Sequence, residues 1–481
     1  MPPPCHSLEE ARNLDRAGKH EEALVSFRGF LEEHPGSVEG WVDYAGLLMV
    51  LGKLAEARRA CDQALRLKSS HYGALVHSAC ILMHQGQLDA SEVQFREAIA
   101  IEPARIAGPL MLSDTLLRMN KLDQARALLE SVLEQAPGNV TALDRLNTVM
   151  ACQRDWVGLR KDMARQLKNH SGAETEYVAS HLDLMFGDMP RGWNRFESRL
   201  QIPDRKPQRS FPQPRWQGEP YVGKTLLLTW EQGFGDTLMF LRFASLAKAL
   251  GGKVLLEVQP PLLEIAATCP GIDEVFPHGY SLPAFDLQAS LLSLPSLFGT
   301  SLDSIPADIP YLHIPTIVPA REGITRALDL ASERTRIGIC WAGNVKYPRD
   351  AKRSIPPAAL TSLGILPDVA WYSFQFETAE APNLPGIVPL GPLLKGFPNT
   401  AFALQGMDLV ITVDTVLAHL AGALGIPTFL LLSFIPDWRW MMGRSDSPWY
   451  PTLRIYRQPL PGDWGPVLAQ VAQDLTGSEA S

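Results

Sequence analysis

Residues 18–35 read GKHEEALVSFRGFLEEHP, and a segment of the same design returns every 34 residues. It returns as residues 52–69 (GKLAEARRACDQALRLKS), residues 86–103 (GQLDASEVQFREAIAIEP) and residues 120–137 (NKLDQARALLESVLEQAP). Four copies in register are much stronger evidence than a single match. A fixed period of this length is typical of solenoids, in which each repeat packs only against its neighbours.

Four positions of the repeat have clear physical roles. The first residue is a glycine or asparagine because the turn between two helices requires tolerance of positive φ. A small residue then allows the helices to approach, a larger apolar residue fills the groove, and proline ends the second helix. The four sets are Gly18, Ala23, Phe27, Pro35; Gly52, Ala57, Cys61, Ser69; Gly86, Ser91, Phe95, Pro103; and Asn120, Ala125, Leu129, Pro137. The 34-residue period is that of the tetratricopeptide repeat (TPR).

The pattern continues in weaker form to residue 200. Residues 140–170 predict a degenerate helical pair, and residues 176–200 predict one more pair with Gly187 at its turn and Trp193 and Phe196 packed inside. We therefore expect TPR-like helical repeats over residues 1–200, with an atypical last repeat where the solenoid meets another domain. Such a solenoid either binds a protein partner along its concave face or only supports or dimerises the chain.

The rest of the chain has the rhythm of an α/β protein. Residues 201–223 hold five prolines and predict an extended linker. Short β-rich runs then alternate with helical segments, which indicates parallel sheets with crossover helices. The predicted strands cover residues 225–230, 253–258, 274–276, 285–287, 337–341, 369–374, 409–413 and 428–432. We expect two Rossmann-like lobes, residues 224–315 and 330–476, with a ligand cleft at the carboxyl ends of their strands.

Composition excludes several classes of function. The 481 residues carry a net charge of −8 and no long basic run, which disfavours a nucleic-acid partner. Six cysteines without a C-x-x-C pair favour a reducing compartment over a zinc site or disulfide framework, so we expect a cytoplasmic protein. The amino-terminal MPPPCHSLEE lacks the pattern of a secretory signal. The apolar stretch 409–434 contains Asp414 and His419, and so predicts buried α/β elements rather than a membrane span.

A glycine loop follows the first strand of the α/β half. Gly233 and Gly235 allow backbone amides to approach a ligand, and Asp236 lies at or near a helix N-terminus at the carboxyl edge of a sheet. A carboxylate there can accept a proton from a substrate hydroxyl as a general base. The alternative is an aspartate that caps an ordinary helix. The loop lacks a complete G-x-G-x-x-G signature and a Walker lysine, which disfavours dinucleotide and P-loop sites.

The strand 409–413 runs directly into a second polar helix start. Asp414 suits the N-cap, and Thr415 and His419, four residues apart, share one helix face. Free amides, a hydroxyl and an imidazole can together hold a diphosphate. A capped helix with a packed histidine is the alternative.

Polar groups also follow the strands 337–341 and 369–374. The first is followed by a basic loop with Asn344, Lys346, Arg349, Lys352 and Arg353, and the second by Gln375. Basic groups at a sheet's carboxyl edge suit a phosphate ligand, although a solvated loop has the same composition. The aromatic segments 436–440 and 447–451 either stack on a base or sugar or pack in the core.

Four stretches together resemble a known family: EQGFGDTLMFLRF (231–243), WAGNVKYPRDAKRSIP (341–356), DLVITVDTVLAHLAGALGIP (408–427) and PDWRWMMGRSDSPWYP (436–451). They resemble bacterial tetratricopeptide proteins with a C-terminal GT-B glycosyltransferase domain. That domain is similar to the heptosyltransferases of glycosyltransferase family 9 and, more distantly, to the O-linked N-acetylglucosamine transferases. The resemblance implies a GT-B fold, in which two Rossmann-like lobes enclose a cleft, behind the helical solenoid.

The resemblance also assigns roles to residues. Asp236 matches the proposed catalytic base, and residues 414–419 match a D-T-x-x-x-H motif for the donor phosphates. Gln288 stands where family members often carry a histidine. The implied donor-binding set is Gly233, Gly235, Asn344, Lys346, Arg353, Gln375, Asp414, Thr415 and His419.

The leading hypothesis is therefore a metal-independent glycosyltransferase without a cofactor. It moves a sugar from a nucleotide-sugar to a protein acceptor held by the repeats; related proteins of this type modify flagellins. Two alternatives remain: a lipopolysaccharide or other glycan as acceptor, and a non-catalytic TPR scaffold with a vestigial transferase fold.

Overall fold

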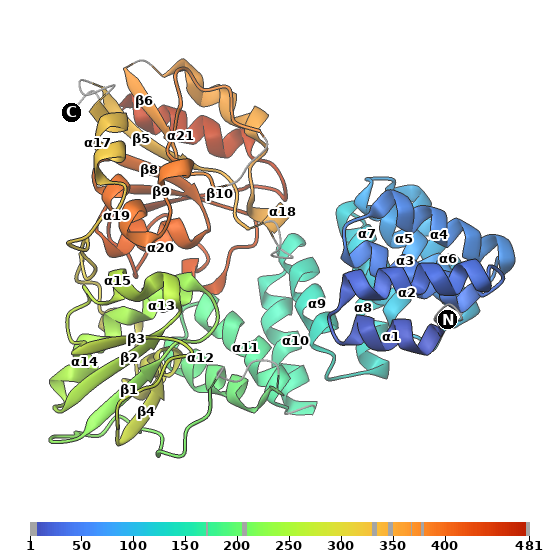
Figure 1. The fold of residues 1–481 in the computed structure, drawn as a ribbon, viewed down its shortest axis with the longest axis horizontal. Helices are drawn as coiled ribbons and strands as arrows, with labels where there is room; N and C mark the ends of the chain where they lie inside the picture. The colour runs from blue at the N-terminus through green and yellow to red at the C-terminus, as the bar shows by residue number, and fades with distance from the viewer. Residues whose placement is uncertain are drawn as a thin grey trace, which may run out of the picture. The chain divides into compact units, whose positions relative to one another are not determined.

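The computed structural model describes residues 7–169, 172–203, 209–329, 334–344, 350–366, 368–376 and 380–477. The chain divides into two compact units between residues 170 and 171. Within the described residues, the first unit is helical and both β-sheets belong to the second (Figure 1). None of the described helices is long and apolar enough to cross a membrane.

The first unit is a run of paired helices, each packed against the next along the chain. Their bounds are α1 Leu8–Arg16, α2 His20–Glu33, α3 Val38–Val50, α4 Leu54–Leu67, α5 Tyr72–His84, α6 Leu88–Ile101, α7 Ala107–Arg118, α8 Leu122–Gln135, α9 Val140–Cys152 and α10 Trp156–Asn169. Side chains one repeat length apart also cap the helices, since Ser37 and His71 accept hydrogen bonds from the third amide beyond them.

The predicted repeat is confirmed at the level of single residues. The turn positions all have positive φ: +74° at Gly18, +72° at Gly52, +76° at Gly86 and +57° at Asn120. Arg154, another 34 residues along, has a φ of +55° and marks the turn of the degenerate pair. The small residues of the pattern are fully buried between helices, as Ala23 and Ala57 show. The repeat period therefore reflects turn geometry and close helix packing.

A last helical pair belongs to the second unit. It consists of α11 (Ala173–Met185) and α12 (Met189–Phe196), and a 3-10 turn η1 (Glu197–Gln201) follows. Gly187 has a φ of +86° at the turn, and Trp193 and Phe196 are buried, as the sequence predicts. The helical region over residues 1–200 is thus divided, and its last pair packs with the α/β elements.

Two parallel sheets form the centre of the second unit. The first has the order β3-β2-β1-β4, and the second has the order β10-β9-β8-β5-β6-β7. Their bounds are β1 Thr225–Thr229, β2 Lys253–Val258, β3 Glu274–Pro277, β4 Leu287–Ser290, β5 Thr335–Cys340, β6 Val369–Ser373, β7 Val388–Pro389, β8 Leu409–Val413, β9 Thr428–Leu432 and β10 Leu453–Arg457. In β1 of the first sheet and β8 of the second, every residue after the first is buried. Such strands are typical of parallel sheets that are covered on both faces.

The other helices of the second unit lie between these strands or follow the last of them. They are α13 Phe234–Phe240, α14 Ala244–Ala249, α15 Leu263–Ala266, α16 Leu294–Leu297, α17 Arg321–Asp329, α18 Asp350–Arg353, α19 Phe397–Gln405, α20 Val416–Ala423 and α21 Gly465–Gly477. Several details differ from the sequence prediction. The fourth strand begins two residues later than expected and the fifth two residues earlier, and β7 and β10 are additional strands. The helical segment that starts at the glycine loop is interrupted by a 3-10 turn at Leu241–Phe243.

The linker is not simply an extended spacer in its second half. The Trp216 amide donates to the Gln288 carbonyl at 2.8 Å, and the Gln288 amide donates to the Pro214 carbonyl at 3.1 Å. The side chain of Gln288 also donates to the carbonyls of Phe211 and Gln213. Gln288 therefore fixes the linker along the open edge of β4, where a sheet would otherwise present unpaired backbone groups.

Candidate functional site

The glycine loop lies at the carboxyl end of β1. Gly233 is the N-cap of α13, and Asp236 is the third residue of its first turn. The Gly233 amide donates to Oδ2 of Asp236 at 2.9 Å. Asp236 thus lies at the helix start as predicted, but Gly233 is the N-cap and the Asp236 carboxylate accepts a hydrogen bond from the amide of that residue. Its other carboxylate oxygen remains available for a different contact.

The second helix start lies at the carboxyl end of β8. The expectation that Asp414 is the N-cap is wrong: Thr415 is the cap, and its hydroxyl accepts a hydrogen bond from the Leu417 amide at 3.3 Å. Asp414 precedes the cap, and its carbonyl accepts a 2.6 Å hydrogen bond from Nη1 of Arg353. Two predicted donor-binding residues from separate motifs therefore lie in contact.

His419 lies one turn into α20 and is almost fully buried. Its Nδ1 is 3.0 Å from the Tyr450 hydroxyl, and its ring stacks on Trp440 with 5.2 Å between ring centroids. Gly235 of the first lobe lies directly against this ring, because a Cβ added there would be 2.7 Å from Cδ2 of His419. Helices α13 and α20 are consequently side by side, with the two predicted motifs facing each other.

An arginine joins the two lobes at this point. Arg439 lies in the 3-10 turn η9 (Trp438–Trp440) and forms an ion pair with Oδ1 of Asp236, 203 residues away in the chain. Its Nη1 also donates to Oδ1 of Asp437 at 2.6 Å. We call Asp236, Arg353, Asp414, Asp437 and Arg439 the charged cluster. Sequence reasoning missed Asp437 and Arg439, although both lie in the quoted PDWRW segment.

Burial controls the protonation of this cluster. It raises the pKa of Asp414 to about 6, with a further contribution from the nearby Asp437 carboxylate. It also raises the pKa of Asp236, although the Arg439 guanidinium acts in the opposite direction. Burial and the charge of Arg439 lower the pKa of His419 to about 3, so its imidazole is neutral at physiological pH. Within the charged cluster, Arg353 and Arg439 are the groups that can bind an anion.

The remaining predicted residues have less direct places. Oε1 of Gln375 accepts hydrogen bonds from the amides of Trp341 and Ala342 at 3.2 and 3.0 Å, so Gln375 braces the loop after β5. Asn344 is the last described residue of that loop. Lys346 and Arg349 lie outside the described residues. The Arg353 guanidinium lies against Gly343, where a Cβ would be 2.2 Å from Nη2.

The aromatic segments near the C-terminus pack in the core. Trp438, Trp440 and Trp449 are at most 4% exposed, so the alternative of a stacking platform for a base or sugar does not describe them. The Trp193 ring contacts Trp438 and Trp449, with 5.3 and 6.1 Å between ring centroids. The last helical pair therefore supports the turn that carries Arg439.

The same helical pair also supports the glycine loop. Arg199 in η1 is fully buried and donates to both carboxylate oxygens of Glu231 at 2.9 and 3.0 Å. Its guanidinium also donates to the hydroxyl of Ser293 at 2.8 Å. Since Glu231 lies just before Gly233, this ion pair attaches η1 to the start of the glycine loop.

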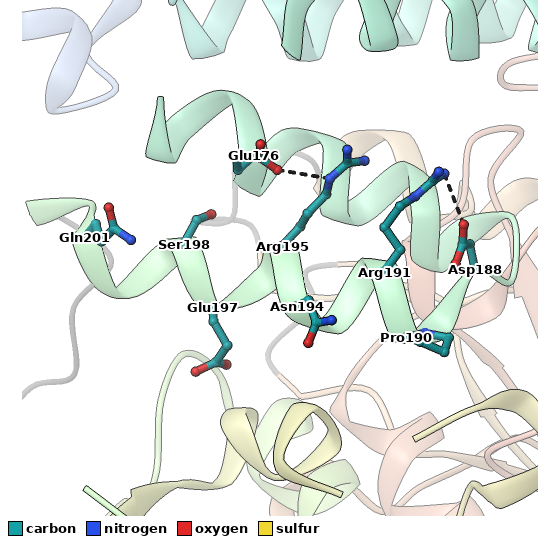
Figure 2. Close-up of a pocket in the computed structure, with 9 residues that line it drawn as sticks. All are labelled: Glu176, Asp188, Pro190, Arg191, Asn194, Arg195, Glu197, Ser198 and Gln201. Atoms are coloured by element: carbon teal, nitrogen blue, oxygen red, sulfur yellow. Dashed lines mark ion pairs between the residues drawn. The ribbon is translucent and has the colours of Figure 1, made fainter. Parts of the chain in front are cut away.

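The described residues of the second unit also form hollows elsewhere. An open groove of about 620 Å³ follows α12 and η1, where Arg195 pairs with Glu176 and Arg191 with Asp188 (Figure 2). A more enclosed cavity of about 440 Å³ lies beside β4 and the linker and is lined by Thr229 and Ser290 at the strand ends. Neither is lined by the charged cluster. Among the described residues, no group of three or more His, Cys, Asp and Glu side chains is arranged to hold a metal ion.

Comparisons with known proteins identify the helical repeats. Residues 7–163 match the family model described as the middle TPR-like domain of cilia and flagella-associated protein 70. The first unit is a TPR-like repeat array. Protein FlbA of Caulobacter vibrioides is 25% identical over 500 residues, a match that covers 89% of this chain and 83% of FlbA. That span necessarily includes most of the α/β unit.

Other matches are confined to a smaller part of the chain. The CTR9 homolog of Arabidopsis thaliana is 26% identical over 147 residues, which is 29% of this chain and 14% of that protein. Among solved structures, Pseudomonas aeruginosa PilF is 18% identical, with a TM-score of 0.34, over 41% of this chain and 90% of its own. MamA of Desulfovibrio magneticus RS-1 is 16% identical, with a TM-score of 0.31, over 33% of this chain and 90% of its own.

Proposed function

We propose that this protein transfers a sugar from a nucleotide-sugar donor to a protein acceptor, and that its α/β unit is a GT-B glycosyltransferase. The observation that carries the proposal is the meeting of the two lobes at the carboxyl ends of both central sheets, where Asp236 pairs with Arg439 and Gly235 lies against His419. In open α/β sheets, ligands bind at such strand ends.

The residues of the site divide the chemistry between the two lobes. The donor diphosphate lies near Thr415 and Arg353, whose helix end and guanidinium attract negative charge. Asp236 accepts the proton of the acceptor hydroxyl while that oxygen attacks the anomeric carbon. The bond from the sugar to the nucleotide breaks, and the nucleoside diphosphate leaves with its charge stabilised by the arginines and the helix amides.

Asp236→Asn tests the base assignment. Nucleoside diphosphate release from the sugar donor should fall at least 100-fold, because general-base catalysis typically contributes 10²–10⁴-fold. Thermal stabilisation by the nucleotide should persist. Asp286→Asn is the matched control, since Asp286 also accepts a backbone amide bond, at Thr225, but lies outside the charged cluster. Equal rates for Asp236→Asn and the control would disprove the role of Asp236.

A fragment that starts at residue 172 tests the protein acceptor. It retains α11, α12 and the Arg199–Glu231 pair, which a cut at residue 201 would remove. We expect this fragment to bind nucleotide and hydrolyse donor like the full chain but to lose transfer to protein. Unchanged transfer to a glycan acceptor would favour the glycan alternative instead. If no nucleoside diphosphate stabilises the full chain, the chain is a scaffold and the proposal fails.

A further inference from the structure

Arg439 is held in two different ways on its two sides. On one side, its Nη1 and its backbone amide both donate to Oδ1 of Asp437, at 2.6 and 3.1 Å, and its guanidinium lies 4.3 Å from the Trp438 ring centroid. These contacts lie within the turn η9 itself. On the other side, Nη2 reaches across to Asp236 in the first lobe. Arg439 therefore stays anchored to its own lobe if the contact with Asp236 is lost.

Asp236 also has a local anchor that does not depend on Arg439. Its Oδ2 accepts the Gly233 amide bond, so only Oδ1 is engaged across the lobes. The side chains are 14% exposed at Asp236 and 10% exposed at Arg439, so little water competes for the pair. An anion that enters the site therefore competes with Oδ1 for the same guanidinium.

The other groups around Arg439 are those expected to hold the donor phosphates. Trp440, the residue after Arg439 in η9, stacks on the His419 ring with 5.2 Å between ring centroids, which places this turn beside the segment 414–419. Burial raises the pKa of Asp236 and Arg439 counteracts this. Loss of the guanidinium from Asp236 would therefore make its carboxylate a stronger base.

We propose that Arg439 is a further donor-binding residue and that the Asp236–Arg439 ion pair is a latch opened by the donor diphosphate. The diphosphate takes over Nη2, Asp437 keeps the guanidinium in place, and Asp236 is released to accept the proton of the acceptor hydroxyl. Donor binding then precedes productive acceptor binding. This inference rests on the proposed function, and it adds a residue and an order of events.

If the ion pair is a latch, loss of the Asp236 charge should tighten diphosphate binding. If the pair only holds the two lobes together, the same change should not tighten it. Calorimetry on the full chain would use the nucleoside diphosphate, among UDP, GDP, ADP and TDP, that most stabilises the protein. Asp236→Asn removes the competitor, so the diphosphate should bind about 10-fold more tightly, equivalent to about 1.4 kcal/mol. Arg439→Gln should bind it at least 10-fold more weakly, and the double variant should gain nothing over Arg439→Gln. The free nucleoside should bind all variants equally.

The outcomes separate the latch from the proposed function. If wild type binds a diphosphate but a folded Asp236→Asn binds it no more tightly, the latch is refuted while the transferase proposal stands. If wild type binds none of the four, the proposed function fails and the latch with it. Should Asp236→Asn not fold, Asp236→Ser carries the same prediction, since its hydroxyl can still accept the Gly233 amide bond. Asp286→Asn should bind like wild type.

Discussion

The buried pair of Arg199 and Glu231 offers a direct test of how the last helical pair joins the α/β unit. The two side chains are 0% and 2% exposed, and two hydrogen bonds join them. Arg199→Met would leave the Glu231 carboxylate buried without its cation. Removal of one partner from a buried ion pair typically costs about 3–5 kcal/mol. We expect a loss of this size in the free energy of unfolding of the second unit.

Urea denaturation followed by tryptophan fluorescence would measure this loss. Only Trp41 and Trp156 of the eleven tryptophans precede residue 171, so the signal reports mainly on the second unit. With an m-value of about 3 kcal/mol/M, the midpoint should fall by about 1–1.7 M. In the double variant Arg199→Met, Glu231→Leu most of the loss should be recovered, because apolar replacement of a buried pair is often neutral.

A surface ion pair of the same sheet provides the control. Lys253 and Glu274 are 46% and 48% exposed, so Lys253→Met should cost less than about 1 kcal/mol. If Arg199→Met shifts the midpoint no more than Lys253→Met, the pair is not buried in solution. The conclusion that α12 and η1 position the glycine loop would then be wrong.

Three further predictions concern the site itself. Burial raises the pKa of Asp414 from 3.8 to about 6, so the contribution of this residue to stability is complete below pH 3.8 and lost as the pH rises past 6. Asp414→Asn should therefore raise the free energy of unfolding at pH 8 by roughly 3 kcal/mol and change it little at pH 4. Thermal denaturation at both pH values would measure the difference. Gly235→Ala should weaken nucleoside diphosphate binding at least 10-fold, because its Cβ would clash with His419. The control Gly233→Ala should change binding by less than about threefold, since its Cβ would lie 3.2 Å from Oδ2 of Asp236. Equal effects of the two variants in calorimetry would contradict the packing argument. Gln375→Leu should cost about 2–4 kcal/mol in urea denaturation, because the two backbone amides that it accepts lose their partner, and an unchanged midpoint would refute this role.

Features with a local cause could be predicted from the sequence. The turn residues from Gly18 to Asn120 need positive φ, which few residue types tolerate, so their spacing exposes the repeat. Strands such as Lys253–Val258 and Leu409–Val413 were predicted with their observed bounds, because continuous apolar runs between turn residues indicate buried parallel strands. The helix start at Asp236 follows from the same local signals.

The composition of the charged cluster could not be predicted in this way. Asp437 and Arg439 lie in a segment whose tryptophans dominate its pattern, and nothing in that pattern points to Asp236. Asp414 and Thr415 are both residue types that suit an N-cap, and the structure has Thr415 in that position. Residue preferences restrict the N-cap to a few residue types, and the backbone conformation decides which of two suitable neighbours is the cap.

The helical repeat, the parallel α/β unit and the two polar helix starts can be recognised from the amino-acid sequence, because each depends on interactions between residues close in the chain. Three features are visible only in the folded chain: the last helical pair belongs to the second unit, Gln288 fixes the linker on β4, and Arg439 meets Asp236. Asp236 and Arg439, for example, are 203 positions apart in the chain. The spacing of residue types along the chain does not indicate such pairs, because they form only when whole faces of helices and sheets pack together.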